Sequence, residues 1–506
     1  MFKRLVFLCL ALLIPAAGWA WTPEELASYE ARAEQMRQQW GDPALAIAIV
    51  HGNRVIWSRG FGTLSEDDTT PITPQTLFPA GSISKSFTAA AALQLVHEGQ
   101  LGLEVPICNW LTDLELSSSD VTQRATLFDL LANRTGFYPH EGDLAVAFGY
   151  GADTLYGRLS HLPLRHTFRS RFSYSNWNYF LAGRLIQEAS GMPYEQFVKE
   201  RILQPLGLKQ ATFKMSAHQL PMGHFWHVDA HEVRLQSMPP VDIRAIAAAG
   251  GLFASVEELG RWVALHLQQG RLNGQQILDP WVVDTMQQPL IEMPQDSLSW
   301  WYPTTLRGQS VHYGFGWSIQ QHLGRKLVGH LGLAPGYMVT VSFMPDENVG
   351  IVIMSSSYAS LLPIALQLDF YQHWLKPCSC LYVDWSTRLR QQQTASLAEQ
   401  SRLEREMEEE RIGVEPPVPL KGCIGTYTHP FYGTVELRAH PTDRNQLRLL
   451  GGPNRLPGRL IPWEGADMRL FWDTLPLPNV FVTQVTDVNE RLIGLQVGPF
   501  FLQKAN

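Results

Sequence analysis

The sequence predicts an α/β (α+β) protein that combines helices with an antiparallel sheet and ends in a small C-terminal β-barrel. Three observations support this prediction. Four segments between residues 311 and 355 read as successive strands separated by turns. An alanine-rich apolar segment that follows Ser82 reads as a buried helix. Short strands between residues 434 and 497, separated by Gly, Pro and Asn, are typical of a barrel.

Length and charge bound the class of protein. A chain of 506 residues suggests more than one domain and supplies enough apolar residues for a large core. The formal net charge of -7 is mild, and the chain has no basic block. Nucleic acid is therefore not an expected partner.

Residues 1–20 read as a secretory signal peptide that is cleaved after Ala20. Lys3 and Arg4 precede an apolar run over residues 5–14, and small residues precede the cleavage point. The run is too short to span a bilayer. We therefore expect a periplasmic or secreted protein with no stable membrane anchor.

Four cysteines follow the predicted cleavage point, and they are Cys108, Cys378, Cys380 and Cys423. They are too few for a disulfide scaffold. Export permits a bridge, but the sequence does not say which cysteines pair.

Two strands are predicted over residues 44–50 and 54–60, and the first chemical motif follows this hairpin. Ser82 lies where a helix begins, and Lys85 follows one turn later on the same face, so its amine can reach the serine hydroxyl. A serine nucleophile needs a base, and a buried lysine favours its neutral form. The alternative is a capping serine with a solvated lysine. Ser-x-x-Lys occurs only once in the chain, and the apolar helix favours the chemical interpretation.

Tyr174 and Asn176 form the second motif, in a loop before a helix predicted over residues 181–190. Side chains two residues apart point the same way in extended backbone. A phenol near a lysine can act as general base once its pKa is lowered, and an amide can orient a substrate carbonyl. The alternative is an aromatic-rich turn of the core.

His330 forms the third motif, at the end of a strand predicted over residues 326–330 and before a glycine turn. The pattern His-x-Gly also occurs elsewhere in the chain, so only this context singles out His330.

In chain order the three motifs are Ser82–Lys85, Tyr174–Asn176 and His330–Gly332. Together they resemble the signatures of the penicillin-recognising serine hydrolases. The most similar group contains class C beta-lactamases, D-aminopeptidases, D-Ala-D-Ala carboxypeptidases and related esterases. The resemblance covers most of residues 22–375. It implies an antiparallel sheet flanked by helices, a helical subdomain, and an active site between them.

The resemblance implies roles for the catalytic residues. Ser82 would attack a carbonyl and form an acyl-enzyme, while Lys85 and Tyr174 would share the proton transfers. Water would then release the acyl group, with Tyr174 as the base. No cofactor and no metal are expected in this chemistry.

The resemblance also implies substrate-binding residues. Asn176 would hold the substrate amide, and the backbone amides of Ser82 and Leu333 would form an oxyanion hole. His330 and Gly332 are the other two residues expected to bind the substrate. Many relatives carry a lysine where this chain has His330. Because histidine has a reference pKa of about 6.5, its pull on a substrate carboxylate is weaker.

Two further stretches have more than one interpretation. The family often has a histidine at the position of Asn133, and we expect only a packing consequence there. Trp300, Trp301 and Tyr302 are interpreted as buried packing, with the lining of a substrate pocket as the alternative.

A cluster of polar residues suggests a metal site, and its members are His224, His227, Asp229 and His231. The same stretch fits a turn and strand that rim the cleft in the resembling family. We therefore predict no metal ligands in this chain.

The C-terminal third changes in composition. Residues 384–411 read as an exposed, charged helix, and a proline-rich linker follows. We predict a signal peptide over residues 1–20, a hydrolase domain over 21–375, a helical linker over 376–419 and a barrel over 420–506. The barrel resembles the lipocalin-like domain of some peptidases in this family. It can cover the cleft, bind a ligand or assemble subunits, and these alternatives stay open.

We expect an exported serine hydrolase that cleaves amide bonds of small peptides, either with D-residues or related to the cell wall. A carboxylesterase or a weak beta-lactamase is the alternative enzyme. A non-catalytic penicillin-binding or sensor protein is the alternative outside catalysis. The expected partner is a small-molecule or peptide substrate, and a homo-oligomer is left open.

Overall fold

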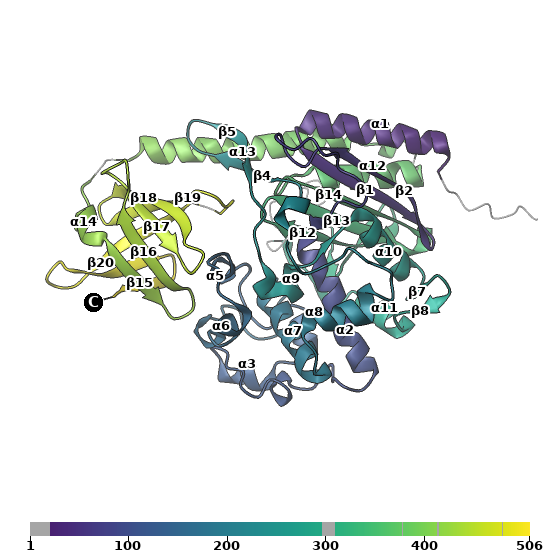
Figure 1. The fold of residues 1–506 in the computed structure, drawn as a ribbon, viewed down its shortest axis with the longest axis horizontal. Helices are drawn as coiled ribbons and strands as arrows, with labels where there is room; N and C mark the ends of the chain where they lie inside the picture. Colours follow the sequence, from purple (N-terminus) through teal and green to yellow (C-terminus); the bar gives the residue numbers. More distant parts are fainter. Residues whose placement is uncertain (1–20, 296–308, 377, 412–413, 478, 506) are drawn as a thin grey trace, which may run out of the picture.

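The structure is a computed structural model that describes residues 21–295, 309–376, 378–411, 414–477 and 479–505. The predicted signal peptide and the aromatic insert at residues 300–302 lie outside these ranges. The long helix α13 (Trp385–Glu409) runs from the large N-terminal lobe to the C-terminal barrel (Figure 1).

The large lobe is built on an antiparallel sheet. Its eight strands, in order across the sheet, are β2 (Arg54–Gly62), β1 (Ala44–His51), β14 (Val349–Ser355), β13 (Tyr337–Met344), β12 (Arg325–Ala334), β11 (Ser318–His322), β10 (His312–Tyr313) and β9 (Ile291–Glu292). Every residue of β13 and β14 is buried. Such continuous burial indicates that both faces of the sheet are covered.

Alternate residues of β13 face two different helices. Ser342 lies 3.0 Å from the Tyr371 hydroxyl on helix α12 (Leu362–Leu375). Phe343 stacks on His266 of helix α10 (Val256–Leu267), with ring centroids 5.5 Å apart. Since successive side chains of a strand point to opposite faces, α12 and α10 cover the two sides of the sheet. Helix α1 (Pro23–Trp40) packs beside α12 (Figure 1).

The helical part of the lobe surrounds α2 (Ser84–His97), which is buried from Ser84 to Leu95. The other helices of this part are α3 (Ser119–Arg124), α4 (Leu127–Leu131), α5 (Asp143–Ala147), α6 (Ala152–Tyr156), α7 (Asn176–Ser190), α8 (Tyr194–Val198), α9 (Ala247–Gly250) and α11 (Pro280–Met286). Short two-stranded ribbons pair β3 (Phe78–Pro79) with β6 (Phe253–Ala254), β4 (Gly223–Val228) with β5 (Val233–Met238), and β7 (Arg271–Leu272) with β8 (Gln275–Gln276).

Several predicted boundaries differ from the observed ones. The strand expected over residues 311–319 is divided into β10 and β11, because Gly316 between them has a φ of 75°. The strand expected to end at His330 continues to Ala334, since its pairing with β13 extends to Ala334 opposite Tyr337. The helix expected over residues 181–190 already begins at Asn176, because the Ser175 side chain caps it by accepting a hydrogen bond from the Trp177 amide.

The C-terminal lobe is a closed eight-stranded barrel. Its strands are β15 (Gly425–His429), β16 (Gly433–Ala439), β17 (Leu447–Gly451), β18 (Leu456–Glu464), β19 (Asp467–Trp472), β20 (Val480–Thr486), β21 (Leu492–Val497) and β22 (Phe500–Lys504). Met468 and Leu470 are buried inside it, whereas Arg469 between them faces outward and pairs with Glu404 of α13 at 2.5 Å. The short helix α14 (Leu420–Cys423) precedes the barrel. The predicted fold class, including the barrel, is confirmed.

The four cysteines of the described residues divide into one bridge and two free thiols. Cys378 and Cys380 form a disulfide, whereas Cys108 and Cys423 are free. Among the helices of the described ranges, none combines the length and the apolar character needed to cross a membrane.

Asn133 holds the turn that carries Tyr174. It is fully buried and has a left-handed φ of 54°. Its Oδ1 accepts hydrogen bonds from the Ser175 amide and from Asn178 Nδ2, both at 3.0 Å. Beyond packing, this side chain is thus the acceptor for the buried Ser175 amide.

We predict that Asn133→Ala lowers the free energy of unfolding by about 2–3 kcal/mol, since it removes a buried acceptor and strains a left-handed residue. Urea unfolding measures this loss. Asn133→Gly is the matched control, because glycine tolerates this φ and should recover part of the loss. Equal unfolding midpoints for Asn133→Ala and the unmodified protein would contradict the prediction.

Candidate active site

Ser82 lies on a tight turn at the entrance of α2. It belongs to the 3-10 turn Gly81–Ile83, between β3 and α2, and its side chain is half-buried. Gly81 has a φ of 53°, and a Cβ there would lie 2.8 Å from the Leu333 nitrogen. Only glycine therefore lets the turn approach strand β12 so closely.

Lys85 is completely buried and surrounded by acceptors. Its Nζ donates to Ser82 Oγ at 3.0 Å, to Asn176 Oδ1 at 2.7 Å and to the Ala249 carbonyl at 2.8 Å. Burial lowers the pKa of Lys85 to about 7, while the Asp143 carboxylate acts in the opposite direction. A substantial neutral fraction of this amine is thus available near neutral pH to accept the serine proton.

Tyr174 lies beside Lys85. Its ring centroid is 4.8 Å from Lys85 Nζ, and an interaction with the Ser82 side chain partly offsets the effect of burial on the pKa of Tyr174. Burial raises the pKa of Tyr174 well above its ordinary value. The sequence argument required a lowered phenol pKa for a general base. In this structure Lys85 is the better proton acceptor, and neutral Tyr174 is suited to relay a proton.

Asn176 is held by charged groups on both sides of its amide. Lys85 occupies Oδ1, and Nδ2 donates to Asp143 Oδ2 at 2.9 Å. A carboxylate can only accept, so the NH₂ group of Asn176 points to Asp143 and its oxygen to Lys85. One hydrogen of Nδ2 is left for a substrate carbonyl.

Asp143 is a site residue that the sequence analysis missed. It begins the five-residue helix α5, and its Oδ2 also lies 3.0 Å from His140 Nδ1. Its Oδ1 is buried and has no hydrogen-bond partner within the described part of the chain. No motif marks this residue, because it lies 33 positions before Asn176.

His330 is buried beside the two tyrosines of the site. Its Nε2 lies 3.1 Å from the Tyr313 hydroxyl, its Nδ1 lies 2.6 Å from the Leu331 carbonyl, and its ring centroid is 6.1 Å from that of Tyr174. The carbonyl requires the proton on Nδ1, so Nε2 accepts from Tyr313. Burial, together with nearby Lys85, lowers the pKa of His330 to about 3. The imidazole is therefore neutral at pH 7 and attracts no carboxylate.

Strand β12 brings Gly332 and Leu333 against the serine turn. Pairing of β12 with β11 ends at Gly329, so the edge beyond it is free for the turn Gly81–Ile83. A Cβ at Gly332 would lie 2.1 Å from the Ala80 carbonyl oxygen. This close approach brings the backbones at Ser82 and Leu333 together, as an oxyanion hole requires.

All seven residues selected from the sequence thus converge on one site. Five contribute side chains and two contribute the β12 backbone. Tyr313 and Tyr179 join them: Tyr313 through His330, and Tyr179 through a ring whose centroid lies 5.6 Å from Lys85 Nζ.

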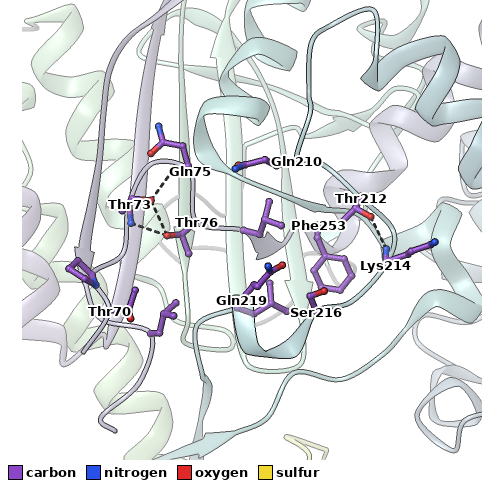
Figure 2. A pocket seen from close by; sticks show the side chains of 14 residues that line it. Thr70, Thr73, Gln75, Thr76, Gln210, Thr212, Lys214, Ser216, Gln219 and Phe253 are labelled. Carbon is purple, nitrogen blue, oxygen red and sulfur yellow. Dashed lines mark hydrogen bonds between the residues drawn. The ribbon is translucent and has the colours of Figure 1, made fainter. Parts of the chain in front are cut away.

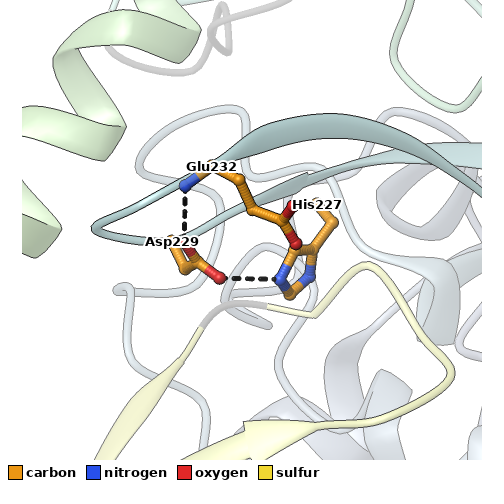
Figure 3. A group of neighbouring side chains, drawn as sticks. All are labelled: His227, Asp229 and Glu232. Carbon is orange, nitrogen blue, oxygen red and sulfur yellow. Dashed lines mark hydrogen bonds and ion pairs between the residues drawn. The ribbon is translucent and has the colours of Figure 1, made fainter.

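The histidine-rich stretch divides into separate contacts. His224 Nδ1 lies 3.1 Å from the Ser356 carbonyl oxygen, and His231 faces Glu408 on α13 at 3.5 Å. His227, Asp229 and Glu232 group at the tip of the β4–β5 hairpin, with one candidate ligand atom of each within 4.8 Å of the others (Figure 3). Asp229 also accepts a hydrogen bond from the Glu232 amide at 2.8 Å, and this bond belongs to the hairpin turn.

Figure 2 shows the side chains that line a cavity of about 470 Å³, and Ser82 is not one of them. Its lining includes Thr70, Thr73, Gln210, Lys214 and Phe253, and none of the seven residues selected above. We assign no chemistry to it.

The sequence model of the Beta-lactamase family matches residues 30–363. The chain belongs to the Beta-lactamase family. This membership confirms the resemblance inferred from the three motifs, and it makes the protein a relative of serine hydrolases.

Individual relatives of this Beta-lactamase family protein are distant. An unguisins hydrolase of Aspergillus campestris is 23% identical over 79% of this chain and 75% of its own length. The octameric penicillin-binding protein homologue of Pyrococcus abyssi has a TM-score of 0.60 and 22% identity, and the match covers 95% of this chain and 100% of that one. The D-amino acid amidase of Ochrobactrum anthropi SV3, solved with L-phenylalanine amide, has a TM-score of 0.55 and 20% identity. This match covers 69% of this chain and 98% of the amidase. These structures share the fold.

We predict that acylation of Ser82 speeds up as pH rises through about 7, because Lys85 loses its proton there. Asp143→Asn should move this rise to lower pH, since the Asp143 carboxylate favours the protonated lysine. The measurement is the rate of labelling by a fluorophosphonate as a function of pH. Asp153→Asn, at an exposed carboxylate of nearby α6, is the control and should leave the profile unchanged. A profile that is flat around neutrality would contradict the assignment of Lys85.

Proposed function

We propose that this protein is an exported serine hydrolase that forms an acyl-enzyme on Ser82 and hydrolyses amide bonds of small peptides with D-residues or of cell-wall origin. The observation that carries the proposal is the buried Lys85 amine, 3.0 Å from the Ser82 hydroxyl, with its pKa lowered to about 7. Export rests on the pattern of residues 1–20 alone.

The reaction follows from the positions of the proton-bearing groups. Lys85 takes the Ser82 proton as the Ser82 oxygen attacks the substrate carbonyl carbon. The amides of Ser82 and Leu333 stabilise the oxyanion. Tyr174 passes this proton from Lys85 to the amide nitrogen, the C–N bond breaks, and the amine leaves. Water then attacks the ester carbonyl carbon, the acid is released, and the Ser82 oxygen recovers a proton.

The charges of the site favour some substrates over others. His330 is neutral at pH 7, because its pKa is lowered to about 3. Among the described residues, the charged group that acts on Lys85 is the Asp143 carboxylate. His330 therefore does not attract a substrate carboxylate, whereas neutral or positively charged substrates are compatible with the Asp143 carboxylate. This argument favours an amidase or peptidase over the beta-lactamase alternative.

The proposed amidase activity agrees with the name of the Ochrobactrum anthropi amidase. A carboxylesterase would use the same serine, lysine and tyrosine, and it stays the second candidate. A homo-oligomer also stays a prediction, since the octamer belongs to the Pyrococcus abyssi homologue.

We expect a fluorophosphonate to label Ser82. Mass spectrometry of the modified peptide measures this labelling directly. Ser82→Ala should abolish the adduct, and Lys85→Ala should slow labelling by about 10³-fold because it removes the base. Glu257→Ala, which removes a carboxylate of α10 that accepts a hydrogen bond from the Ser58 hydroxyl at 3.0 Å, is the control for folding. If neither the fluorophosphonate nor a fluorescent penicillin gives an adduct, the non-catalytic alternative is favoured.

We expect D-phenylalanine amide and p-nitrophenyl acetate to be turned over at least about tenfold more efficiently than nitrocefin, because neutral His330 does not attract the carboxylate of nitrocefin. Initial rates of the three substrates on one preparation provide the comparison. Highest efficiency on nitrocefin would overturn the charge argument. Turnover of the ester without the amide would favour the carboxylesterase.

A further inference from the structure

The barrel contacts the large lobe directly beside the active site. The turn between β15 and β16 carries Phe431, which is fully buried, and Tyr432, which is 8% exposed. Both side chains enter the helical part of the lobe around α5 and α6. Figure 1 shows β15 and β16 facing these helices across the gap between the lobes.

Phe431 packs on the residue that follows Asn176. Its ring meets the Trp177 ring edge-on, with centroids 5.4 Å apart and an interplanar angle of 85°. Trp177 is fully buried, and its indole nitrogen donates to the Glu141 carbonyl at 2.7 Å. The barrel thus covers the first turn of α7, in which Asn176 is the first residue.

Tyr432 holds the residue that precedes Asp143. Its hydroxyl accepts a hydrogen bond from the Gly142 amide at 3.2 Å. Gly142 has a φ of 90°, and a Cβ there would lie 2.7 Å from the Trp177 indole nitrogen and 3.0 Å from a Phe431 ring carbon. Glycine therefore allows the strand turn, the indole and the start of α5 to meet at one point.

The two residues held by the barrel adjoin the two that hold the catalytic lysine. Trp177 is bonded to Asn176, and Gly142 is bonded to Asp143. Asn176 Nδ2 donates to Asp143, and Asn176 Oδ1 accepts from Lys85. A continuous series of contacts leads from the barrel turn to the lysine.

Helices α5 and α6 depend on such support. Each has five residues, which is too short for a helix to be stable by itself. The barrel supplies further anchors here: the Thr434 amide donates to the Tyr150 hydroxyl at 2.9 Å, and Asn454 Nδ2 donates to the Ala147 carbonyl at 3.2 Å. Arg158 Nη1 of the lobe in turn donates to the Phe431 carbonyl at 3.2 Å.

We propose that the barrel is a positioning domain for catalysis, in which Phe431 and Tyr432 hold Asp143 and Asn176 in register with Lys85. The proposal rests on the proposed function in that these residues serve the reaction of Ser82. This role differs from the three that the sequence left open for the barrel, and it follows from the contact of the barrel turn with Trp177 and Gly142. Phe431 and Tyr432 are positioning residues.

The first test measures the structure without catalysis. Hydrogen–deuterium exchange of the full-length chain is compared for Phe431→Ala and for Phe501→Ala, which truncates a partly exposed phenylalanine on β22 of the same barrel. We expect Phe431→Ala to accelerate exchange at least tenfold in peptides that cover residues 138–148 and 174–178. Phe501→Ala should leave both peptides unchanged. Equal exchange in the two variants would overturn the proposal.

The second test asks whether the effect passes through Asp143. Fluorophosphonate labelling is measured for Phe431→Ala, Asp143→Asn and the double variant. We expect Phe431→Ala to shift the pH profile of labelling to lower pH, in the same direction as Asp143→Asn. In the Asp143→Asn background it should have little further effect, because interacting residues are not additive. Strict additivity would overturn the proposal.

Two safeguards keep the outcomes distinct. If Phe431→Ala does not fold, Tyr432→Phe removes only the acceptor of the Gly142 amide, and it should still accelerate exchange over residues 138–148. Unchanged exchange in this variant would count against the proposal. Faster exchange in Phe431→Ala combined with no labelling of the unmodified protein would overturn the proposed function and leave the positioning role supported.

Discussion

The desolvation of one amine underlies the whole site. Lys85 has no exposed surface, and its three hydrogen-bond acceptors are a hydroxyl, an amide oxygen and a backbone carbonyl. None of the three carries a full negative charge, so they compensate only part of the cost of burying an ammonium. The amine is therefore poised between its two protonation states. Every neighbouring element is arranged to keep water out and to keep these acceptors in place.

The burial that lowers the pKa of Lys85 also keeps Tyr174 and His330 uncharged. The same desolvation raises the pKa of Tyr174 and lowers the pKa of His330 to about 3. The site thus works with a neutral phenol and a neutral imidazole, and the Asp143 carboxylate provides the opposing charge. The low polarity that lowers the pKa of Lys85 thus also leaves His330 without a charge for anionic substrates.

The arrangement of the chain explains how distant segments reach this amine. The open edge of β12, the entrance of α2 and the first turn of α7 come from separate parts of the sequence. Close backbone approaches at Gly81 and Gly332 join the first two, and the hydrogen bond from Lys85 to Asn176 joins the third. The barrel adds a fourth segment through Phe431 against Trp177. Short helices without stability of their own lie between barrel and site. The C-terminal lobe is thereby connected to the chemistry at the level of individual hydrogen bonds.

The sequence by itself determined the three motifs, the order of strands over residues 311–355 and the barrel, because hydrophobic period, turn residues and motif spacing are local properties. The seven residues selected from it all lie at one site. Asp143 and the Phe431–Trp177 contact were invisible to it, since both join residues that only the folded chain makes neighbours. The sequence also suggested a titrating His330 and a phenol base. Tertiary structure decided otherwise, because a pKa depends on how completely the surrounding protein excludes water.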